Sequence, residues 1–228
     1  WQIDYATGDS EIYLLPFALA TGAQSARLEA DHPESVIAQV RYRQSDRWAE
    51  GVLYDALWSP QVGRTLLNII TGRRRISGRF GALNGISYRR ISVKGKQAAA
   101  IEPRVITGAQ NNTSLAFGEQ CVLKVFRRID SGTHPEVEMS AFLNAAGFEH
   151  APLLNGAIQY QHAAGQKITL AVLHRYTPYK ATGREIALAA VDAAVANSAQ
   201  YLGDLPDPSP CAQNLLALAT TLSDENGP

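Results

Sequence analysis

Apolar residues recur along the chain at two spacings, every second residue and every third or fourth residue, which indicate strands and helices respectively. In the first hundred residues the two-residue period predicts a hairpin around the turn at residues 7–10. Further strands are expected at residues 36–43, 48–54 and 86–93. Helical spacing predicts a short helix at residues 24–30 and a longer one that begins after Ser59-Pro60 and ends at Gly72.

A second series of elements follows residue 104. We expect strands near Val105 and at residues 114–117, 121–126, 157–161 and 167–173. One helix is predicted from Pro135 to about Gly147, and another at residues 185–199, before the proline-rich segment 204–210. The polar, alanine-ended stretch at residues 94–100 indicates a boundary. The pattern therefore predicts an α+β fold in three parts, residues 1–100, 101–180 and 181–228.

The helix that begins at Pro135 carries an apolar stripe with the i, i+3, i+4, i+7 spacing of a single face, namely Met139, Phe142, Leu143 and Ala146. We expect this stripe to be buried. Glu138 lies beside it in the first turns of the helix. A carboxylate is favoured there by the helix dipole alone, so its position has a purely structural explanation as well as a functional one.

Charge and cysteine content limit the classes of protein to which the chain can belong. Basic and acidic residues number 21 each, and this neutral balance argues against a dedicated nucleic-acid-binding protein. No apolar run reaches the roughly 18 residues that a membrane span needs, and no signal peptide is apparent. Cys121 and Cys211 do not form the pattern of a disulfide-rich secreted domain. We therefore expect a cytoplasmic protein without a membrane or nucleic-acid partner.

Lys124 stands between Val122 and Phe126 on one face of a predicted strand. Kinases place a lysine in this setting, where it binds the α- and β-phosphates of ATP and is held by a glutamate of the next helix. Glu138 is the expected partner. Taken alone, the strand favours the other explanation, an exposed lysine on an edge strand.

The turn before that strand contains Asn111, Asn112, Thr113 and Ser114, and the chain has no Walker A sequence. Small polar side chains and free backbone N–H groups can bind phosphate oxygens, but an ordinary hairpin turn has the same composition. The histidines and cysteines show no zinc-ligand spacing, so no metal site is predicted.

Three stretches of the chain together resemble the maltokinase family, which typically shows a Ser-Asn-Thr-Ser turn, a Leu-Lys-Val/Leu-Phe-Arg-Arg strand and a Gly-x-Asn-Pro-Asp-x-Glu helix start. The corresponding stretches here are Asn111–Ser114, Val122–Arg128 and Ser131–Glu138. Residues 51–57, 72–75 and 152–157 extend the similarity toward the maltokinase region of bacterial trehalose synthase–maltokinase fusion proteins. The resemblance covers roughly residues 1–180.

The resemblance implies a cap domain at residues 1–100 followed by a protein-kinase-like N-lobe at residues 101–180, with an antiparallel sheet and one αC-type helix. It implies phosphorylation of maltose to maltose 1-phosphate with ATP and Mg²⁺, for trehalose and α-glucan metabolism, and a trehalose synthase domain or subunit as partner. Lys124 and Glu138 would position ATP, and Asn111, Asn112, Thr113 and Ser114 would form the phosphate loop. Residues 174–179, including His174 and Tyr176, would be the hinge that contacts adenine through its backbone.

The sequence also departs from the family pattern. His134 and Glu136 replace the usual asparagine and aspartate, and residues 175–184 match the hinge poorly. The family's His-Gly-Asp-x-His and Asp-Phe-Glu/Asp-Gly motifs, which carry the catalytic aspartate and the Mg²⁺ ligands, do not occur, so no catalytic residue is predicted and a missing C-lobe is expected. The chain alone should be inactive as an enzyme. Two alternatives stay open: a non-catalytic module that docks on trehalose synthase, and the N-lobe of a kinase for another sugar such as glucosamine.

Overall fold

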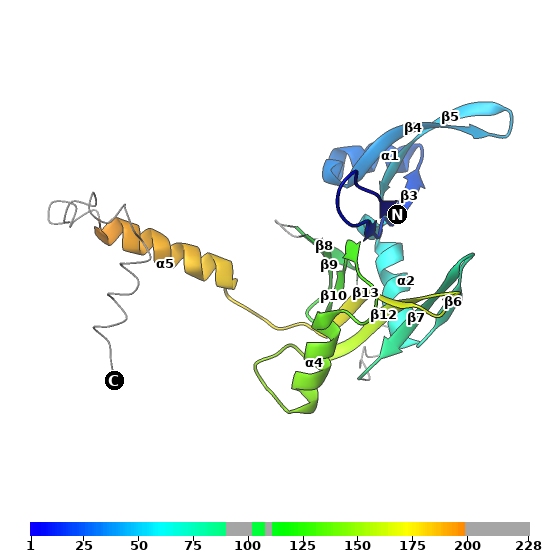
Figure 1. Cartoon of the computed structure of the whole chain (residues 1–228). Coiled ribbons are helices and arrows are strands. Elements are labelled where there is room, and N and C mark those ends of the chain that lie inside the picture. The colour runs from blue at the N-terminus through cyan, green and yellow to red at the C-terminus, as the bar shows by residue number, and fades with distance from the viewer. Residues whose placement is uncertain (90–101, 108–110, 199–228) are drawn as a thin grey trace, which may run out of the picture. The chain divides into compact units, whose positions relative to one another are not determined.

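A computed structural model describes residues 1–89, 102–107 and 111–198, and the chain forms two compact units, residues 1–178 and 179–228. The described part of the first unit contains three sheets and the helices α1, α2 and α4 (Figure 1). All pairings between its named strands are antiparallel. The predicted α+β class is confirmed. The segments predicted at residues 90–93, 94–100 and 204–210 lie outside the described residues, as does Cys211.

The predicted N-terminal hairpin is present and is extended by a strand from much later in the chain. Strand β1 (Gln2–Ile3) pairs with β2 (Glu11–Tyr13), and β2 also pairs with β11 (Arg128–Ile129). The Arg128 guanidinium lies 2.9 Å from the Glu11 carboxylate across this pairing. The first residues of the chain are therefore attached to the segment that follows the lysine strand.

A second three-stranded sheet has the order β3-β5-β4, formed by Phe17–Ala20, Arg47–Asp55 and Val36–Gln44. Helix α1 (Ala23–Asp31) packs its Leu28 against a small buried cluster of Ala20, Val52 and Tyr54. Short 3-10 helices follow α1 and β5, at Pro33–Ser35 and at Ala56–Trp58. Strands β4 and β5 agree with the strands predicted at residues 36–43 and 48–54, whereas β3 was not predicted.

The largest sheet has seven strands in the order β6-β7-β12-β13-β10-β9-β8. Their bounds are β6 Arg75–Ser77, β7 Gly81–Ser87, β8 Arg104–Ile106, β9 Thr113–Phe117, β10 Cys121–Val125, β12 Leu154–His162 and β13 Lys167–Arg175. Strand β7 thus begins five residues earlier than predicted. Because β6 and β7 pair into the same sheet as β12, a boundary at residue 100 does not separate the sheets.

Helices cover the two faces of this sheet. Helix α2 (Pro60–Thr71) buries Leu67, Ile69 and Ile70 in the main core, together with Leu123 of β10 and Leu173 of β13. Helix α4 (Pro135–Ala145) buries Val137 in a second cluster, whose other members are Phe126, Leu154, Ala157 and Val172. Val172 and Leu173, which are consecutive in β13, belong to different clusters because successive side chains of a strand point to opposite faces. The α4 face is the one that carries Lys124.

The predicted buried stripe of α4 is wrong. Met139 and Phe142 are 53% and 65% exposed, whereas Val137 and Ser140 are buried. At 3.6 residues per turn, the face that meets the sheet is rotated about half a turn from the predicted one. The face that meets the sheet combines Val137, buried in the second cluster, with two polar contacts. The Asn144 Oδ1 accepts a hydrogen bond from the Leu154 N–H at 2.7 Å, and Ser140 contacts His174.

The second unit contains one described helix, α5 (Gly183–Ser198). A capping box starts it: the Glu185 N–H donates to the Thr182 hydroxyl at 3.2 Å, and the Thr182 N–H donates to the Glu185 carboxylate at 2.6 Å. This agrees with the predicted helix at residues 185–199, apart from residue 199, which is not described. Across the described residues, no helix combines the length and apolar character that crossing a membrane requires.

Candidate functional site

Lys124 lies in the middle of β10, on the face of the sheet that α4 covers. Its strand is paired on one side with β9, where Ser114 is opposite, and on the other with β13, where Val172 is opposite. Lys124 is therefore not on an edge strand, so its position cannot be explained as that of an exposed edge-strand lysine. Its side chain is 36% exposed, so the ammonium is open to a ligand while its stem packs on the sheet.

The Lys124 ammonium donates to the Glu136 carboxylate, with 2.7 Å between Nζ and Oε2. The prediction that Glu138 makes this contact is wrong, because Glu138 is exposed on the other side of the buried helix face. Residues two positions apart on a helix are about 200° apart around its axis, so Glu136 and Glu138 cannot both point at one lysine. Glu136 is the residue that stands where the family pattern has an aspartate, and it reaches the lysine from the first turn of α4.

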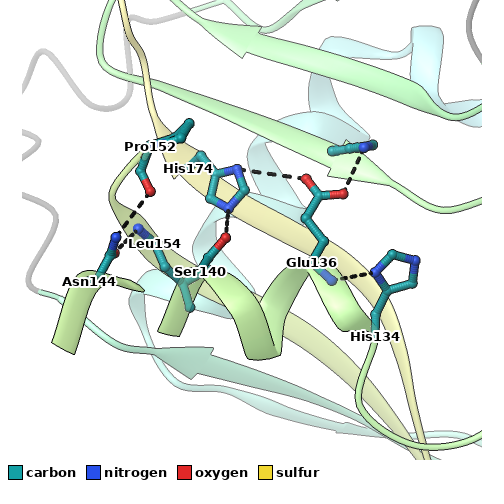
Figure 2. A network of polar contacts seen from close by, with 8 residues as sticks. His134, Glu136, Ser140, Asn144, Pro152, Leu154 and His174 are labelled. Atoms are coloured by element: carbon teal, nitrogen blue, oxygen red, sulfur yellow. Dashed lines mark hydrogen bonds and ion pairs between the residues drawn. The ribbon is translucent and has the colours of Figure 1, made fainter. Parts of the chain in front are cut away.

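His134 fixes the start of that helix. Its ring Nδ1 accepts a hydrogen bond from the Glu136 N–H at 3.1 Å, as an N-cap residue does (Figure 2). The imidazole stacks on Phe126, with 3.7 Å between ring centroids. Burial lowers the pKa of His134, with Glu136 opposing the shift and Lys124 adding to it, which favours the neutral ring that an acceptor needs.

His174 lies beside the Glu136 carboxylate oxygen that Lys124 does not contact. Its Nδ1 lies 3.9 Å from the Glu136 Oε1, and its Nε2 lies 3.3 Å from the Ser140 hydroxyl, as Figure 2 shows. The side chain is only 16% exposed. Burial is the largest cause that lowers the His174 pKa, Lys124 lowers it further, and Glu136 opposes them. A neutral His174 leaves Lys124 as the charged partner of Glu136.

The residues predicted as an adenine hinge make different kinds of contact within the protein, His174 through its side chain and Arg175 and Tyr176 through their main-chain N–H groups. His174 belongs to β13 and is opposite Val122 in the pairing with β10, and its side chain serves the glutamate. The N–H of Tyr176 donates to the Gln120 carbonyl at 3.0 Å, and the N–H of Arg175 donates to the Leu153 carbonyl at 2.8 Å. These two N–H groups are occupied within the protein. In this structure, neither N–H group is therefore available for a hinge contact to an adenine base.

The predicted phosphate loop lies at the beginning of β9. Asn111 and Asn112 form a bend, and Thr113 and Ser114 are the first residues of the strand. The pairing of Ser114 with Lys124 puts this segment next to the lysine. The structure thus places Ser114 opposite Lys124, whereas Thr113 pairs with Val125 and lies on the other face of the sheet. The lysine contacts Glu136 in place of Glu138.

Arg127, which the sequence analysis did not single out, contacts this segment and is itself held by Asp55. The Arg127 guanidinium donates to the Thr113 hydroxyl from Nε at 3.0 Å and from Nη2 at 2.6 Å, and Nη2 also donates to the Asp55 carboxylate. The Arg-Arg pair after the lysine strand was a visible signal for Arg127. Asp55 had none, because 72 positions separate it from its partner.

No group of three or more histidine, cysteine, aspartate or glutamate side chains that could hold a metal ion occurs within the described ranges. Cys121 is a free thiol at the centre of the main core. A comparison with models of known protein families finds no match for this chain. The chemistry of the site is therefore read from its geometry: a positively charged group held by a carboxylate, beside a segment of small polar residues.

Proposed function

We propose that this chain carries the nucleotide-binding lobe of a maltokinase-type sugar kinase. The observation that carries the proposal is the 2.7 Å contact between Lys124 and Glu136, which joins the interior strand β10 to the first turn of α4. Phosphoryl transfer is catalysed mainly by positioning and by electrostatic stabilisation of phosphate oxygens. A lysine held in place by a carboxylate, and still open to solvent, suits that task.

The order of the elements supports the same proposal. Two strands, one helix and two further strands follow one another as β9, β10, α4, β12 and β13, with the lysine on the second strand and the glutamate on the helix. This is the order that the kinase resemblance implies. The 111–114 segment lies beside Lys124 and would hold the phosphates of Mg-ATP while the lysine binds the α- and β-phosphates.

Maltose is the proposed sugar, maltose 1-phosphate the product, and a trehalose synthase domain or subunit the partner. Because the His-Gly-Asp-x-His and Asp-Phe-Glu/Asp-Gly motifs are not found among the 228 residues, we place the catalytic aspartate and the Mg²⁺ ligands in a part of the protein outside this sequence. In the 228-residue chain alone, Lys124 and its surroundings bind the nucleotide but do not transfer its phosphate.

Thermal unfolding of the 228-residue chain with and without Mg-ATP tests the proposal. A bound ligand at ten times its Kd stabilises the folded state by about 1.4 kcal/mol, so Mg-ATP raises Tm in a concentration-dependent way. Lys124→Ala removes this rise. Lys167→Ala is the matched control, because Lys167 is an exposed lysine at the start of β13, and it keeps the rise. The absence of any Mg-ATP effect on the unmodified chain at millimolar concentration would refute the proposal.

A further inference from the structure

The two carboxylate oxygens of Glu136 lie next to different basic side chains. The Lys124 Nζ is 2.7 Å from Oε2, and the His174 Nδ1 is 3.9 Å from Oε1 (Figure 2). Both basic residues are on the same face of the large sheet, on the adjacent strands β10 and β13. The histidine distance is too long for a hydrogen bond but short enough for an ion pair. Glu136 therefore has a second neighbour that can carry a positive charge.

The surroundings of His174 suit a neutral ring and a charged ring equally well. The Ser140 hydroxyl lies 3.3 Å from Nε2, and a hydroxyl can donate or accept. It donates to the neutral ring, and it accepts from the charged ring, whose Nδ1–H then faces Glu136. Burial, and to a smaller extent the Lys124 charge, lower the pKa of His174 and keep the ring neutral. The hydrogen bonds themselves do not require that state.

His134, the other histidine next to Glu136, is held in one protonation state. Its Nδ1 accepts the hydrogen bond from the Glu136 N–H that starts α4, at 3.1 Å. A protonated imidazole has no acceptor nitrogen, so a charge on His134 would remove this cap. Of the two histidines, His174 is therefore the one that can gain a proton without losing a contact.

A phosphate bound at Lys124 changes the charges around His174. The lysine then shares its positive charge between the phosphate oxygens and Glu136, while the phosphate adds negative charge at the same place. Both changes favour the protonated form of a nearby histidine. Among the described residues, Glu136 of α4 and Lys124 of β10 are the charged groups that act on the ring. The residues opposite His174 in the strand pairing, Val122 and Leu154, are apolar.

We infer that His174 takes up a proton from solution when a phosphate group binds at Lys124, and that it thereby restores the positive charge beside Glu136. The inference rests on the proposed function, and it adds that nucleotide binding at this site is coupled to pH. His174 is a positioning residue, because it acts through Glu136. Since linked binding is reciprocal, the affinity for Mg-ATP rises as the pH falls toward the pKa of the free His174 ring.

Isothermal titration of the 228-residue chain with Mg-ATP, at about pH 6.5 in PIPES and in bis-Tris, tests this coupling. The two buffers differ in ionisation enthalpy, so the difference in heat gives the number of protons taken up. We expect about half a proton, which corresponds to an affinity about threefold higher for each unit by which the pH falls. His174→Gln keeps a polar side chain beside Ser140 but cannot titrate, so Mg-ATP still binds and the uptake is lost. His162→Gln, at the exposed end of β12, is the control and keeps the uptake.

A second measurement uses the unmodified chain and so does not depend on the folding of a variant. The imidazole C–H signal of His174, followed by NMR against pH, should give a pKa about one unit higher with saturating Mg-ATP than without it. Binding without this shift, or an uptake that persists in folded His174→Gln, would overturn the inference and leave the proposed function standing. Failure of the unmodified chain to bind Mg-ATP would overturn both.

Discussion

The Lys124 ammonium and the Glu136 carboxylate lie 2.7 Å apart, between strand β10 inside the large sheet and the first turn of α4. The glutamate is held from both sides, by His134 at its main-chain N–H and by His174 beside its carboxylate. This arrangement makes Glu136, rather than Glu138, the residue that decides where the lysine points. The two glutamates differ by two positions on one helix, and that makes them a natural experimental pair.

Replacement of these glutamates by glutamine should have unequal effects. Glu136→Gln removes the charge that holds Lys124, and we expect the Mg-ATP affinity of the chain to fall about tenfold, the loss of one charge-assisted hydrogen bond. Glu138→Gln changes an exposed side chain and should leave that affinity within a factor of two or so, as surface substitutions do. Isothermal titration with Mg-ATP measures both. Equal losses in the two variants would contradict the assignment of Glu136.

The stability of the chain should fall on acidification because of His174. Burial lowers its pKa in the folded state below the ordinary 6.5, so the unfolded chain binds more protons as the pH drops. The contribution of His174 to the free energy of unfolding is complete above about pH 6.5 and is lost progressively below it. The slope is at most about 1.4 kcal/mol per pH unit for one group. Ser140, Glu136 and Lys124 face the ring, and of the two charged groups only Glu136 opposes the shift.

Chemical denaturation between pH 7.5 and 5.5 checks this expectation. His174→Gln should flatten the pH dependence without abolishing it, because His134 also has a lowered pKa and contributes with the same sign. His162→Gln, at the exposed end of β12, is the control and should retain the slope of the unmodified chain. An unchanged slope in His174→Gln would show that His174 does not titrate as this environment requires.

Gly85 is required by the close approach of α2 to β7. A Cβ at this position would lie 1.9 Å from the Ile69 carbonyl oxygen, which belongs to the helix backbone and cannot move aside. We expect Gly85→Ala to destabilise the fold by about 3 kcal/mol or more. Gly78→Ala lies before the same strand, where the nearest atom would be 3.5 Å from the new Cβ, and it should cost little. Similar unfolding midpoints in denaturant for both variants would contradict this packing.

Cys121 should be chemically inert while the chain is folded. Its side chain is fully buried, and burial raises the pKa of its thiol to about 12, so almost no thiolate forms near neutral pH. In a Cys211→Ser background it is the single thiol of the chain. We expect no reaction with an aromatic disulfide reagent at pH 8 until guanidinium unfolds the protein. Rapid labelling with an unchanged circular dichroism spectrum would show that the core opens locally at β10.

Most elements could be predicted from the sequence because their signals are local. Alternation over residues 36–43 predicted β4, the turn after it predicted β5, and the Ser59-Pro60 start and Gly72 end predicted α2. The face of α4 could not be predicted in this way. Its apolar stripe points outward, and the polar residues Asn144 and Ser140 face the sheet, where their partners on β12 and β13 stand 10 and 34 positions further along the chain. Hydrophobic spacing gives no information about such polar partners.

By itself, the sequence determined the types of the elements and the place of Lys124 between two apolar residues on one strand face, because periods of 2 and 3.6 residues are properties of the local chain. Only the tertiary structure decided which groups the site brings together. The choice of Glu136 over Glu138 follows from the rotation of α4 on the large sheet. The contact of Asp55 with Arg127 follows from the packing of the β3-β5-β4 sheet, in which Asp55 ends β5. Burial and strand register across many positions select such partners, and neither is written in the local sequence pattern.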